Sequence, residues 1–271
     1  MTRDPQLDDA RCALITGASS GIGEAVAVLA AQSGYRVALL ARRGEELERV
    51  RRSLPRPEEH LSLVCDVSDE ASVARAVREV GERFGRLELL VNNAGSGYRA
   101  PVEELDVAVA RRVFDTNVIG VLLCAKHALP LLKRGRASVV VNVSSVVGRH
   151  AVPGQAVYSA SKAAACSIGE ALRIEWAAYD IAVCTLNPGL TSTGFFAAQV
   201  NPHGLADPSL ASSHGPKEVA RAVLELDRNP KAEVFLRPKW RWLAALSLLA
   251  PRRAEKIFVR RIGENWRVPR R

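Results

Sequence analysis

Apolar runs of strand length alternate with longer segments of helical period along most of this chain. Such alternation is typical of repeated βαβ units, which assemble into a parallel sheet. Strands are expected at residues 11–16, 36–41, 61–65, 87–92, 138–143, 181–186 and 233–236, and helices at 21–33, 44–53, 69–84, 101–134 with a break, 155–178 and 216–228. The run at 138–143 is almost wholly apolar, as expected for a strand that helices cover on both faces. The sequence therefore predicts an α/β fold with a doubly wound parallel sheet of about seven strands.

The positive charge of the chain is concentrated at its C-terminal end. The net charge of the 271 residues is +9. Residues 237–271 contain eleven Lys or Arg residues and two acidic residues, so this segment alone accounts for +9, and the first 236 residues are neutral overall. We therefore expect one domain at 1–236 and a basic extension at 237–271. Because the domain itself has no excess of positive charge, nucleic acid is not an expected partner.

The composition does not indicate a membrane-spanning, exported or metal-binding protein. No segment reaches the roughly 18 consecutive apolar residues that a membrane-spanning helix needs. Residues 1–9 carry three aspartates and no apolar run, so they do not resemble a targeting signal, and we expect a cytoplasmic protein. The cysteines stand singly and mostly within apolar runs, which favours buried free thiols over a metal site: Cys12, Cys65, Cys124, Cys166 and Cys184.

A glycine-rich stretch joins the first expected strand to the first expected helix, and it reads Thr-Gly-Ala-Ser-Ser-Gly-Ile-Gly at residues 16–23. Glycines at this place permit a tight turn and let the backbone approach a pyrophosphate, which rests against the positive N-terminus of the following helix. The alternative is a glycine turn that holds no ligand. The strand and the helix on either side favour a Rossmann-like dinucleotide site.

The end of the second expected strand indicates which dinucleotide binds. A site for NAD(H) is expected to place an acidic residue there, about 20 residues after the glycines, where it binds the ribose hydroxyls. Here Arg42 and Arg43 follow the strand, and no carboxylate is present. A guanidinium suits a 2′-phosphate by charge and by geometry, so NADP(H) is the predicted cofactor, with Arg42 favoured because it is next to the strand. The alternative is that both arginines lie on a solvated helix start.

A tyrosine and a lysine four residues apart form a candidate proton-transfer pair. If 155–178 is a helix, Tyr158 and Lys162 lie side by side on it. The ammonium is then expected to lower the pKa of the phenol toward the range of a general acid or base. Ser145, thirteen residues before the tyrosine, offers a hydroxyl that can position a carbonyl oxygen. The alternative is a surface pair on an amphipathic helix.

Taken together, these motifs resemble the short-chain dehydrogenase/reductase family, in the branch marked by Thr-Gly-x-x-x-Gly-x-Gly and Tyr-x-x-x-Lys, over residues 10–236. The resemblance implies an oxidoreductase that moves a hydride between a nicotinamide and a carbonyl or alcohol group. It implies that Ser145 orients the substrate and that Tyr158 is the proton donor. Lys162 would tune Tyr158 and bind the nicotinamide ribose, and Asn117 would hold a water in a proton relay. Ser144 competes with Ser145, but the spacing to the tyrosine in the family favours Ser145.

The resemblance also implies the residues that contact the cofactor. One group is the glycine loop, and a second is the adenine-contacting pair after strand three. Two further groups are part of the Asn-Asn-Ala-Gly signature at 92–95 and the segment after strand six, on the nicotinamide side. The full set is Gly17, Ser19, Ser20, Gly21, Ile22, Gly23, Arg42, Asp66, Val67, Asn93, Ala94, Gly95, Tyr158, Lys162, Pro188, Gly189, Thr191 and Thr193.

The segment at 194–215 and the C-terminal extension are expected to decide the substrate. The segment has too little periodicity for a regular element, so it is a lid candidate. Its apolar residues favour an apolar carbonyl compound, although packing on the domain explains them equally: Phe195, Phe196, Val200 and Leu205. Three histidines can contact substrate or lie in loops: His150, His203 and His214.

The extension begins with an apolar stretch containing two tryptophans, which predicts a helix that Pro251 ends. A second helix is expected to follow, with Ile257, Phe258 and Ile262 as its apolar residues. The favoured interpretation is that the extension closes the pocket or packs on a second subunit. The alternative is that 239–262 lies on a membrane surface, because tryptophans beside basic residues suit that interface.

The predicted partners follow from the resemblance. It implies a homodimer or homotetramer formed through the helices that carry Asn117 and Tyr158. Two other functions remain open: the same fold acting in double-bond reduction or dehydration, and a non-catalytic NADP-binding protein that serves as a regulator or at a membrane surface. The complete set of Asn117, Ser145, Tyr158 and Lys162 favours catalysis on carbonyl and alcohol groups.

Overall fold

The computed structural model describes residues 10–205 and 213–262. Its centre is one sheet of seven strands in the order β3-β2-β1-β4-β5-β6-β7, and every neighbouring pair is parallel. The strands are β1 (Cys12–Thr16), β2 (Arg36–Ala41), β3 (Leu61–Val64), β4 (Leu89–Asn92), β5 (Val139–Val143), β6 (Ala182–Asn187) and β7 (Glu233–Phe235). The doubly wound α/β fold is confirmed, and so are all seven strands, with ends that move by at most two residues.

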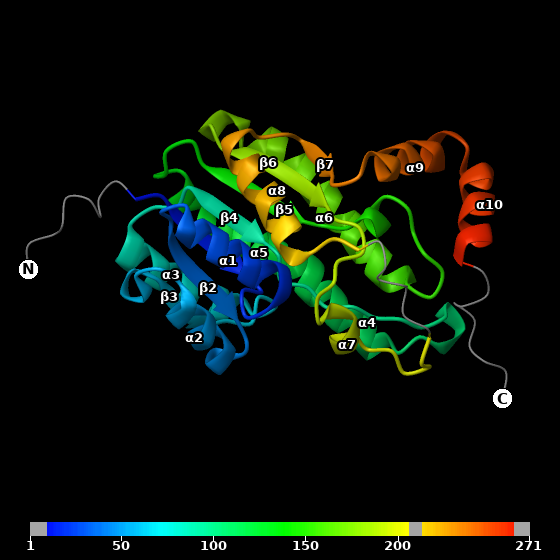
Figure 1. The fold of residues 1–271 in the computed structure, drawn as a ribbon, viewed down its shortest axis with the longest axis horizontal. Coiled ribbons are helices and arrows are strands. Elements are labelled where there is room, and N and C mark those ends of the chain that lie inside the picture. The colour runs from blue at the N-terminus through cyan, green and yellow to red at the C-terminus, as the bar shows by residue number, and fades with distance from the viewer. Residues whose placement is uncertain (1–9, 206–212, 263–271) are drawn as a thin grey trace, which may run out of the picture.

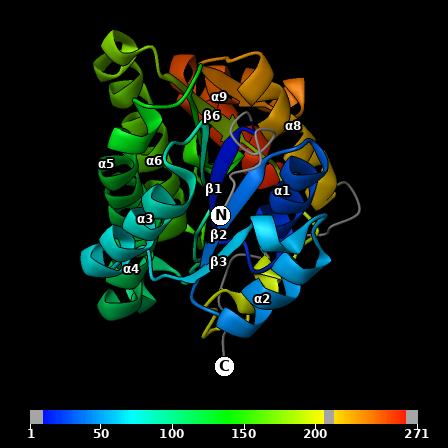
Figure 2. The same cartoon turned by 90° about the vertical axis from the view of Figure 1, so that its left-hand side faces the viewer.

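Helices cover both faces of the sheet. Figure 2 shows α1 (Gly21–Gln32), α2 (Gly44–Ser53) and α8 (Pro216–Arg228) on one side. On the other side lie α3 (Glu70–Phe84), α4 (Val107–Phe114), α5 (Gly120–Leu132) and α6 (Ala156–Glu175). Two apolar clusters fill the two interfaces: one includes Ile15 and Leu39, and the other includes Leu14 and Leu40. Successive residues of one strand therefore point to opposite layers, which explains why these strands are apolar throughout.

The long helix expected at 101–134 is divided. A short 3-10 turn at Val102–Glu104 precedes α4, whose first turn is capped by the Asp106 carboxylate. A π-helical turn, η3 (Asp115–Ile119), then joins α4 to α5. Such a turn inserts an extra residue into the helical path, and π turns are frequent at functional sites. It carries Asn117.

The segment after β6 contains more regular structure than the sequence indicates. Residues Phe195–Ala198 form the short helix α7, so the prediction of no regular element at 194–215 is wrong for these four residues. Two isolated bridges, Tyr98 to Val200 and Thr191 to His214, tie the segment to the domain. Tertiary pairing rather than local periodicity therefore orders this stretch. Part of the predicted lid, 206–212, lies outside the described residues.

The C-terminal extension begins with two helices at one end of the molecule, far from α3 and β3 (Figure 1). They are α9 (Pro238–Leu249) and α10 (Pro251–Ile262), which pack against each other. The first helix ends two residues before Pro251, as predicted. None of the helices in the described residues is both long enough and apolar enough to cross a membrane.

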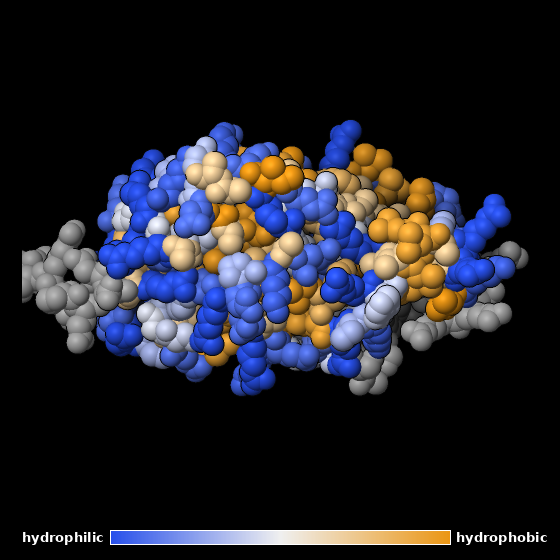
Figure 3. Space-filling model, turned by 90° about the horizontal axis from the view of Figure 1, so that it is seen from above, coloured by the Kyte–Doolittle hydropathy of each residue, from blue (hydrophilic) through white to orange (hydrophobic). Residues whose placement is uncertain are grey.

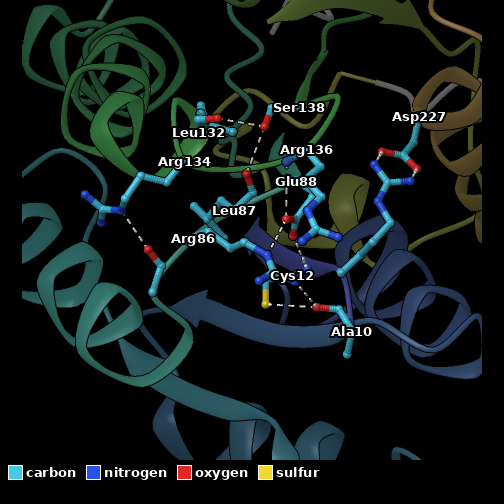
Figure 4. Close-up of polar contacts among 12 residues, drawn as sticks. Ala10, Cys12, Arg86, Leu87, Glu88, Leu132, Arg134, Arg136, Ser138 and Asp227 are labelled. Atoms are coloured by element: carbon cyan, nitrogen blue, oxygen red, sulfur yellow. Dashed lines mark hydrogen bonds and ion pairs between the residues drawn. The ribbon is translucent and has the colours of Figure 1, made fainter. Parts of the chain in front are cut away.

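Buried polar groups tie the strands together at the amino-terminal edge of the sheet. The Glu88 carboxylate, 1% exposed, accepts from the Cys12 backbone N–H at 2.6 Å and from Arg86 Nε at 2.7 Å (Figure 4). Nearby, Arg11 forms a two-pronged ion pair with the buried Asp227. These buried polar groups pair with one another, so their role is to hold the strands together at this edge. The opposite, carboxyl-terminal edge is where ligands bind in such sheets.

Candidate active site

One cavity of about 930 Å³ lies along the carboxyl-terminal edge of the sheet. Of the residues that the sequence predicts as catalytic or cofactor-binding, all but Gly23 and Asn117 line it. The glycine loop is at one end, and Tyr158, Lys162 and Ser145 are further along. The fold therefore brings segments from β1, β2, β3, β4, β5 and β6 to one space.

The glycine loop is held in a backbone conformation that glycine favours. Gly17 and Gly21 have φ values of +66° and +61°, in the left-handed region. A side chain at Gly23 would place its Cβ 2.3 Å from the Gly17 carbonyl oxygen, so Gly23 permits close packing of the loop instead of lining the cavity. The Asn93 amide supports the loop from β4 by donating to Thr16 O at 2.9 Å. The loop thus has the shape of a phosphate cradle at the start of α1.

Both arginines after β2 line the same cavity as the glycine loop. Arg43 Nη2 donates to Ser20 Oγ at 2.8 Å and to Ser19 Oγ at 3.0 Å, so its guanidinium lies against the loop. The sequence favoured Arg42 because of its position next to the strand. Arg43 reaches the two serines because of the tertiary fold. It is the N-cap residue of α2, and this end of α2 lies beside the start of α1. No signal in the local sequence separates the two residues.

Asp66, after β3, is held by its own turn. Its Oδ1 accepts from the Ser68 backbone N–H at 3.0 Å and from Ser68 Oγ at 2.6 Å. Burial acts to raise the pKa of Asp66, but the hydrogen bonds from Ser68, together with the charge of Arg42, hold it below its usual value. Asp66 is therefore an ionised, oriented acceptor at the rim of the cavity.

Ser145, Tyr158 and Lys162 come together between β5 and α6. The Ser145 hydroxyl lies close enough to the Tyr158 phenol to act on its pKa. Behind them Lys162, 6% exposed, donates from Nζ to the Val143 carbonyl oxygen at 2.9 Å. Lys162 Nζ lies 5.9 Å from the centre of the Tyr158 ring. A hydroxyl, a phenol and a buried amine thus meet at one wall of the cavity.

The prediction that Lys162 lowers the pKa of Tyr158 is wrong for this arrangement. Burial raises the pKa of Tyr158 above its usual value, and the neighbouring Ser145 hydroxyl opposes this only in part. Burial also lowers the pKa of Lys162 to about 8. The cause is desolvation, which disfavours the charged form of each group. The lysine directs its donor to Val143 and so does not offset the burial of the phenol.

Ser144 and Ser145 have different surroundings. Ser144 Oγ donates to the Lys162 carbonyl oxygen at 2.8 Å and lies 3.2 Å from the Cys166 thiol, and the residue is 4% exposed. Its hydroxyl therefore holds β5 to α6. Ser145 is the serine that reaches the phenol.

Asn117 is buried in the π turn, behind the cavity wall. Its Nδ2 lies 2.9 Å from both the Ser96 carbonyl oxygen and Ser161 Oγ, and its Oδ1 accepts from the Ser96 backbone N–H at 2.8 Å. A Cβ at Gly95 would lie 3.3 Å from Asn117 Oδ1 and 3.5 Å from Lys162 Nζ. Asn117 and Lys162 therefore approach each other around Gly95, although Asn117 does not line the cavity.

The segment after β6 closes the cavity opposite the glycine loop. A Cβ at Gly21 would lie 3.3 Å from the Thr193 side chain, so the two loops almost touch. The Pro188 carbonyl oxygen accepts from the Val146 backbone N–H at 3.0 Å, which fixes this segment to the Ser145 loop. Pro188, Gly189, Thr191 and Thr193 thus line the same cavity as Ser145, Tyr158 and Lys162.

Aromatic and aliphatic side chains surround the far end of the cavity. The Phe195 ring lies 5.4 Å from the Tyr158 ring, centre to centre, and Phe196 also lines the space. From α9, Trp240 and Leu243 complete the wall, and the Ser247 hydroxyl is hydrogen-bonded to His150. The extension therefore covers this end of the cavity, which is one of the two roles in the favoured interpretation.

Of the three candidate histidines, only His150 lines this cavity. His214 is buried, and its Nδ1 lies 2.8 Å from Glu218 Oε1. All five cysteines are buried and free, as expected. Across the described residues, no group of three His, Cys, Asp or Glu side chains is arranged to hold a metal ion.

Comparisons with known proteins give consistent matches. The family described as short chain dehydrogenase matches residues 11–203. Dehydrogenase/reductase SDR family member 7B of Bos taurus is 32% identical over 270 residues, covering 95% of this chain and 82% of that protein. An alcohol dehydrogenase from the archaeon Thermococcus sibiricus, solved with 5-hydroxy-NADP, has a TM-score of 0.77 at 32% identity, covering 86% of this chain and 98% of its own. A short-chain dehydrogenase/reductase from Burkholderia phymatum, solved with NAD, has a TM-score of 0.82 at 28% identity, covering 90% and 95%.

Proposed function

Because the chain belongs to the short-chain dehydrogenase/reductase family, we propose that it uses NADP(H) to interconvert a carbonyl group and a secondary alcohol on an apolar small molecule. Membership makes it an oxidoreductase that uses a nicotinamide cofactor. The observation that carries the finer proposal is that Ser145, Tyr158 and Lys162 lie together in the same cavity as the glycine loop.

The chain's own residues fit such a cofactor. The positive φ values of Gly17 and Gly21 give the loop a tight turn at the start of α1, where backbone N–H groups would bind a pyrophosphate. Pro188, Gly189, Thr191 and Thr193 would hold the nicotinamide end, and a bound nicotinamide supplies or accepts the hydride. Lys162 would bind the nicotinamide ribose. Its amine would then give up the hydrogen bond to Val143 and donate to the cofactor instead.

The proton step follows from the pKa values. Because burial raises the pKa of Tyr158, its phenol carries a proton at neutral pH and can donate it to a carbonyl oxygen that is being reduced. Ser145 would donate a hydrogen bond to the same oxygen and stabilise the developing negative charge. Asn117 would support the relay from behind Lys162. In the direction of oxidation, the same groups act in reverse.

The preference for NADP(H) rests on two arginines. Arg42 and Arg43 line the cavity beside the glycine loop, and they occupy the two positions directly after β2, where no carboxylate stands. The solved relatives include one with a form of NADP and one with NAD, so the preference must come from this chain's residues. Two guanidinium groups favour the extra phosphate of NADP(H) and would not favour NAD(H).

The cofactor proposal is tested by steady-state kinetics with NADPH and NADH. We expect the wild type to have the higher kcat/KM with NADPH, and Arg43→Ala to raise KM for NADPH while leaving KM for NADH nearly unchanged. Arg42→Ala tests the neighbouring guanidinium in the same way. Arg52, exposed on α2, supplies the control variant Arg52→Ala. Equal or better efficiency of the wild type with NADH would contradict the proposal.

An apolar substrate is proposed from the far end of the cavity. Phe195, Phe196, Trp240 and Leu243 offer apolar contact there, close to the Tyr158 phenol. A screen of aliphatic, aromatic and polycyclic carbonyl compounds against sugars and keto acids, followed by NADPH oxidation, tests this. Turnover of the polar compounds alone would contradict the substrate class, and turnover of none would contradict catalysis on carbonyl groups.

A further inference from the structure

Helix α9 presents two apolar faces. One face carries Trp240 and Leu243, which line the cavity. The other carries Trp242 and Leu249, which share a face because seven residues span about two helical turns. A helix that is apolar all round is normally buried on all sides. One side of α9 lacks such cover in the described residues.

The outer face is strongly exposed. Trp242 is 76% exposed, Leu248 84% and Leu249 87%, and Ile257 of α10 is 42% exposed. Figure 3 shows the apolar patch at this end of the molecule, with hydrophilic side chains around it. Single exposed apolar residues are ordinary, but three large ones clustered on one short helix mark a contact surface.

The charge around this patch points to the class of its partner. Helix α9 contains no acidic residue, and the exposed side chains of Lys239, Arg241, Arg252 and Arg253 accompany the patch. The whole segment 237–271 has a net charge of +9. A second copy of the chain would bring the same positive charge to the contact, and the two would repel each other. An anionic bilayer surface offers the opposite charge and an apolar layer beneath it.

We propose that α9 and α10 dock the protein on the surface of an anionic lipid bilayer. Trp242, Leu248 and Leu249 insert among the headgroups, a position that tryptophan favours because its ring is amphipathic. Arg252 and Arg253 pair with the lipid phosphates and carboxylates. The two helices lie in the interface, since neither is long enough to span the membrane.

Docking in this way would also serve the active site. Trp240 and Leu243 line the cavity from the same helix whose outer face meets the lipid. An apolar carbonyl compound dissolved in the bilayer would thus reach the cavity without crossing much water. This consequence rests on the proposed function, whereas the docking itself does not require catalysis.

Vesicle sedimentation of the full chain tests the docking. The probes are vesicles of phosphatidylcholine alone and of phosphatidylcholine mixed equally with phosphatidylserine, each at low and high salt. We expect binding to the mixed vesicles at low salt and much weaker binding to phosphatidylcholine. We also expect high salt to weaken the binding, because salt screens the attraction. Absence of binding to the mixed vesicles at low salt overturns the proposal.

Variants separate the apolar and charged contributions. The triple variant Trp242→Ser, Leu248→Ser, Leu249→Ser is expected to lose about tenfold or more in vesicle affinity, because it removes the apolar area that enters the headgroup region. The double variant Arg252→Glu, Arg253→Glu is also expected to lose about tenfold or more, because it replaces attraction to the anionic surface by repulsion. Matched controls elsewhere are Ile174→Ser, at a site 81% exposed on α6, and Arg78→Glu with Arg83→Glu on α3. Equal loss in the controls contradicts a specific docking surface.

Three further measurements keep the result interpretable if a variant folds poorly or if catalysis fails. Trp242→Phe preserves the apolar area, so it is expected to bind vesicles while losing the shift in tryptophan emission that the wild type shows on binding. Sedimentation velocity without lipid shows whether the triple Ser variant changes the oligomeric state; if it dissociates a dimer, a second copy covers the patch and the proposal fails. NADPH oxidation with a water-soluble carbonyl compound reports the proposed function separately.

Discussion

Ser145 and Tyr158 lie beside each other at the cavity wall, and Lys162 lies behind them. Ser144, the neighbouring serine, is buried against α6 and bonds to a carbonyl oxygen. The difference between these adjacent hydroxyls shows that a residue type alone does not define a site. At this scale, direction and burial decide which group can meet a substrate.

Replacing Tyr158 by Phe is expected to abolish most of the turnover while leaving the fold and NADPH binding intact. The variant keeps the ring but removes the only proton that the proposed mechanism donates; general acid–base groups typically contribute about 10²–10⁴-fold. The measurements are kcat for a carbonyl substrate, far-ultraviolet circular dichroism and fluorescence titration with NADPH. Reductase activity close to that of the wild type would remove Tyr158 from the mechanism.

The stability of the protein is expected to rise as the pH increases from about 8 to about 10, through Lys162. Burial lowers the pKa of Lys162 to about 8 in the folded chain, so between this value and about 10.4 the unfolded chain binds the proton more readily than the folded one. The cost of burying the charge is therefore fully present below pH 8 and disappears as the lysine loses its proton. Above pH 10 the raised pKa of Tyr158 acts in the opposite sense, because only the unfolded phenol then ionises.

Chemical denaturation of the wild type and of Lys162→Met across this pH range checks the expectation. The free energy of unfolding of the wild type should approach that of the variant from below as the pH rises from 8 to 10. Parallel curves for the two proteins would show that Lys162 does not titrate in this window.

At the scale of secondary structure, the turn between β1 and α1 depends on close backbone packing. Gly23 is the clearest case, since an added Cβ would lie 2.3 Å from Gly17 O and 2.6 Å from Asn93 Nδ2. The π turn between α4 and α5 is the other irregular element. It directs Asn117 toward Ser96 and Ser161. Both irregular elements lie next to the candidate site.

Gly23→Ala is expected to destabilise the fold by about 1–3 kcal/mol, the usual cost of overpacking, and to weaken NADPH binding because the loop must shift. Gly215→Ala is the matched control, since Gly215 has an ordinary φ of −76° and no atom would lie within 4 Å of its Cβ. Denaturant unfolding and fluorescence titration measure the two effects. If both variants behave alike, close packing at Gly23 is not what shapes the loop.

At the scale of the whole molecule, a second exposed apolar surface is a candidate interface for a homodimer. Phe114, Ile119 and Leu122 are exposed apolar residues on α4, the π turn and α5. These elements lie on the same side of the sheet as α6 (Figure 2). A homodimer through this side would bury them, in keeping with the predicted association through the helices that carry Asn117 and Tyr158.

The variant Leu122→Arg is expected to shift the protein from dimer to monomer, because a charge buried in an interface without a partner is costly. Val64→Arg, on the edge strand β3, introduces the same charge at an exposed site away from these helices and should leave the assembly unchanged. Sedimentation velocity distinguishes the two states. A monomeric wild type would show that this surface does not mediate association.

The sequence alone determined the fold class, because each strand and helix is visible over a few neighbouring residues and their alternation runs along most of the chain. The glycine loop was visible in the same way. The sequence also singled out the tyrosine, lysine and serine through their spacing. The physical reason is that hydrophobic periodicity, turn chemistry and helical spacing act locally. The same locality explains why the break in the helix at 101–134 was foreseen but its π turn was not.

Only the tertiary structure decided which groups meet. It buried the Tyr158 phenol and so raised its pKa, directed Lys162 to Val143, laid Arg43 against the glycine loop, and brought Trp240 of the extension to the cavity. Each of these contacts joins segments that are distant in the chain or depends on how much water a side chain loses. Desolvation and long-range packing belong to the assembled molecule, which is why neither spacing nor composition revealed them.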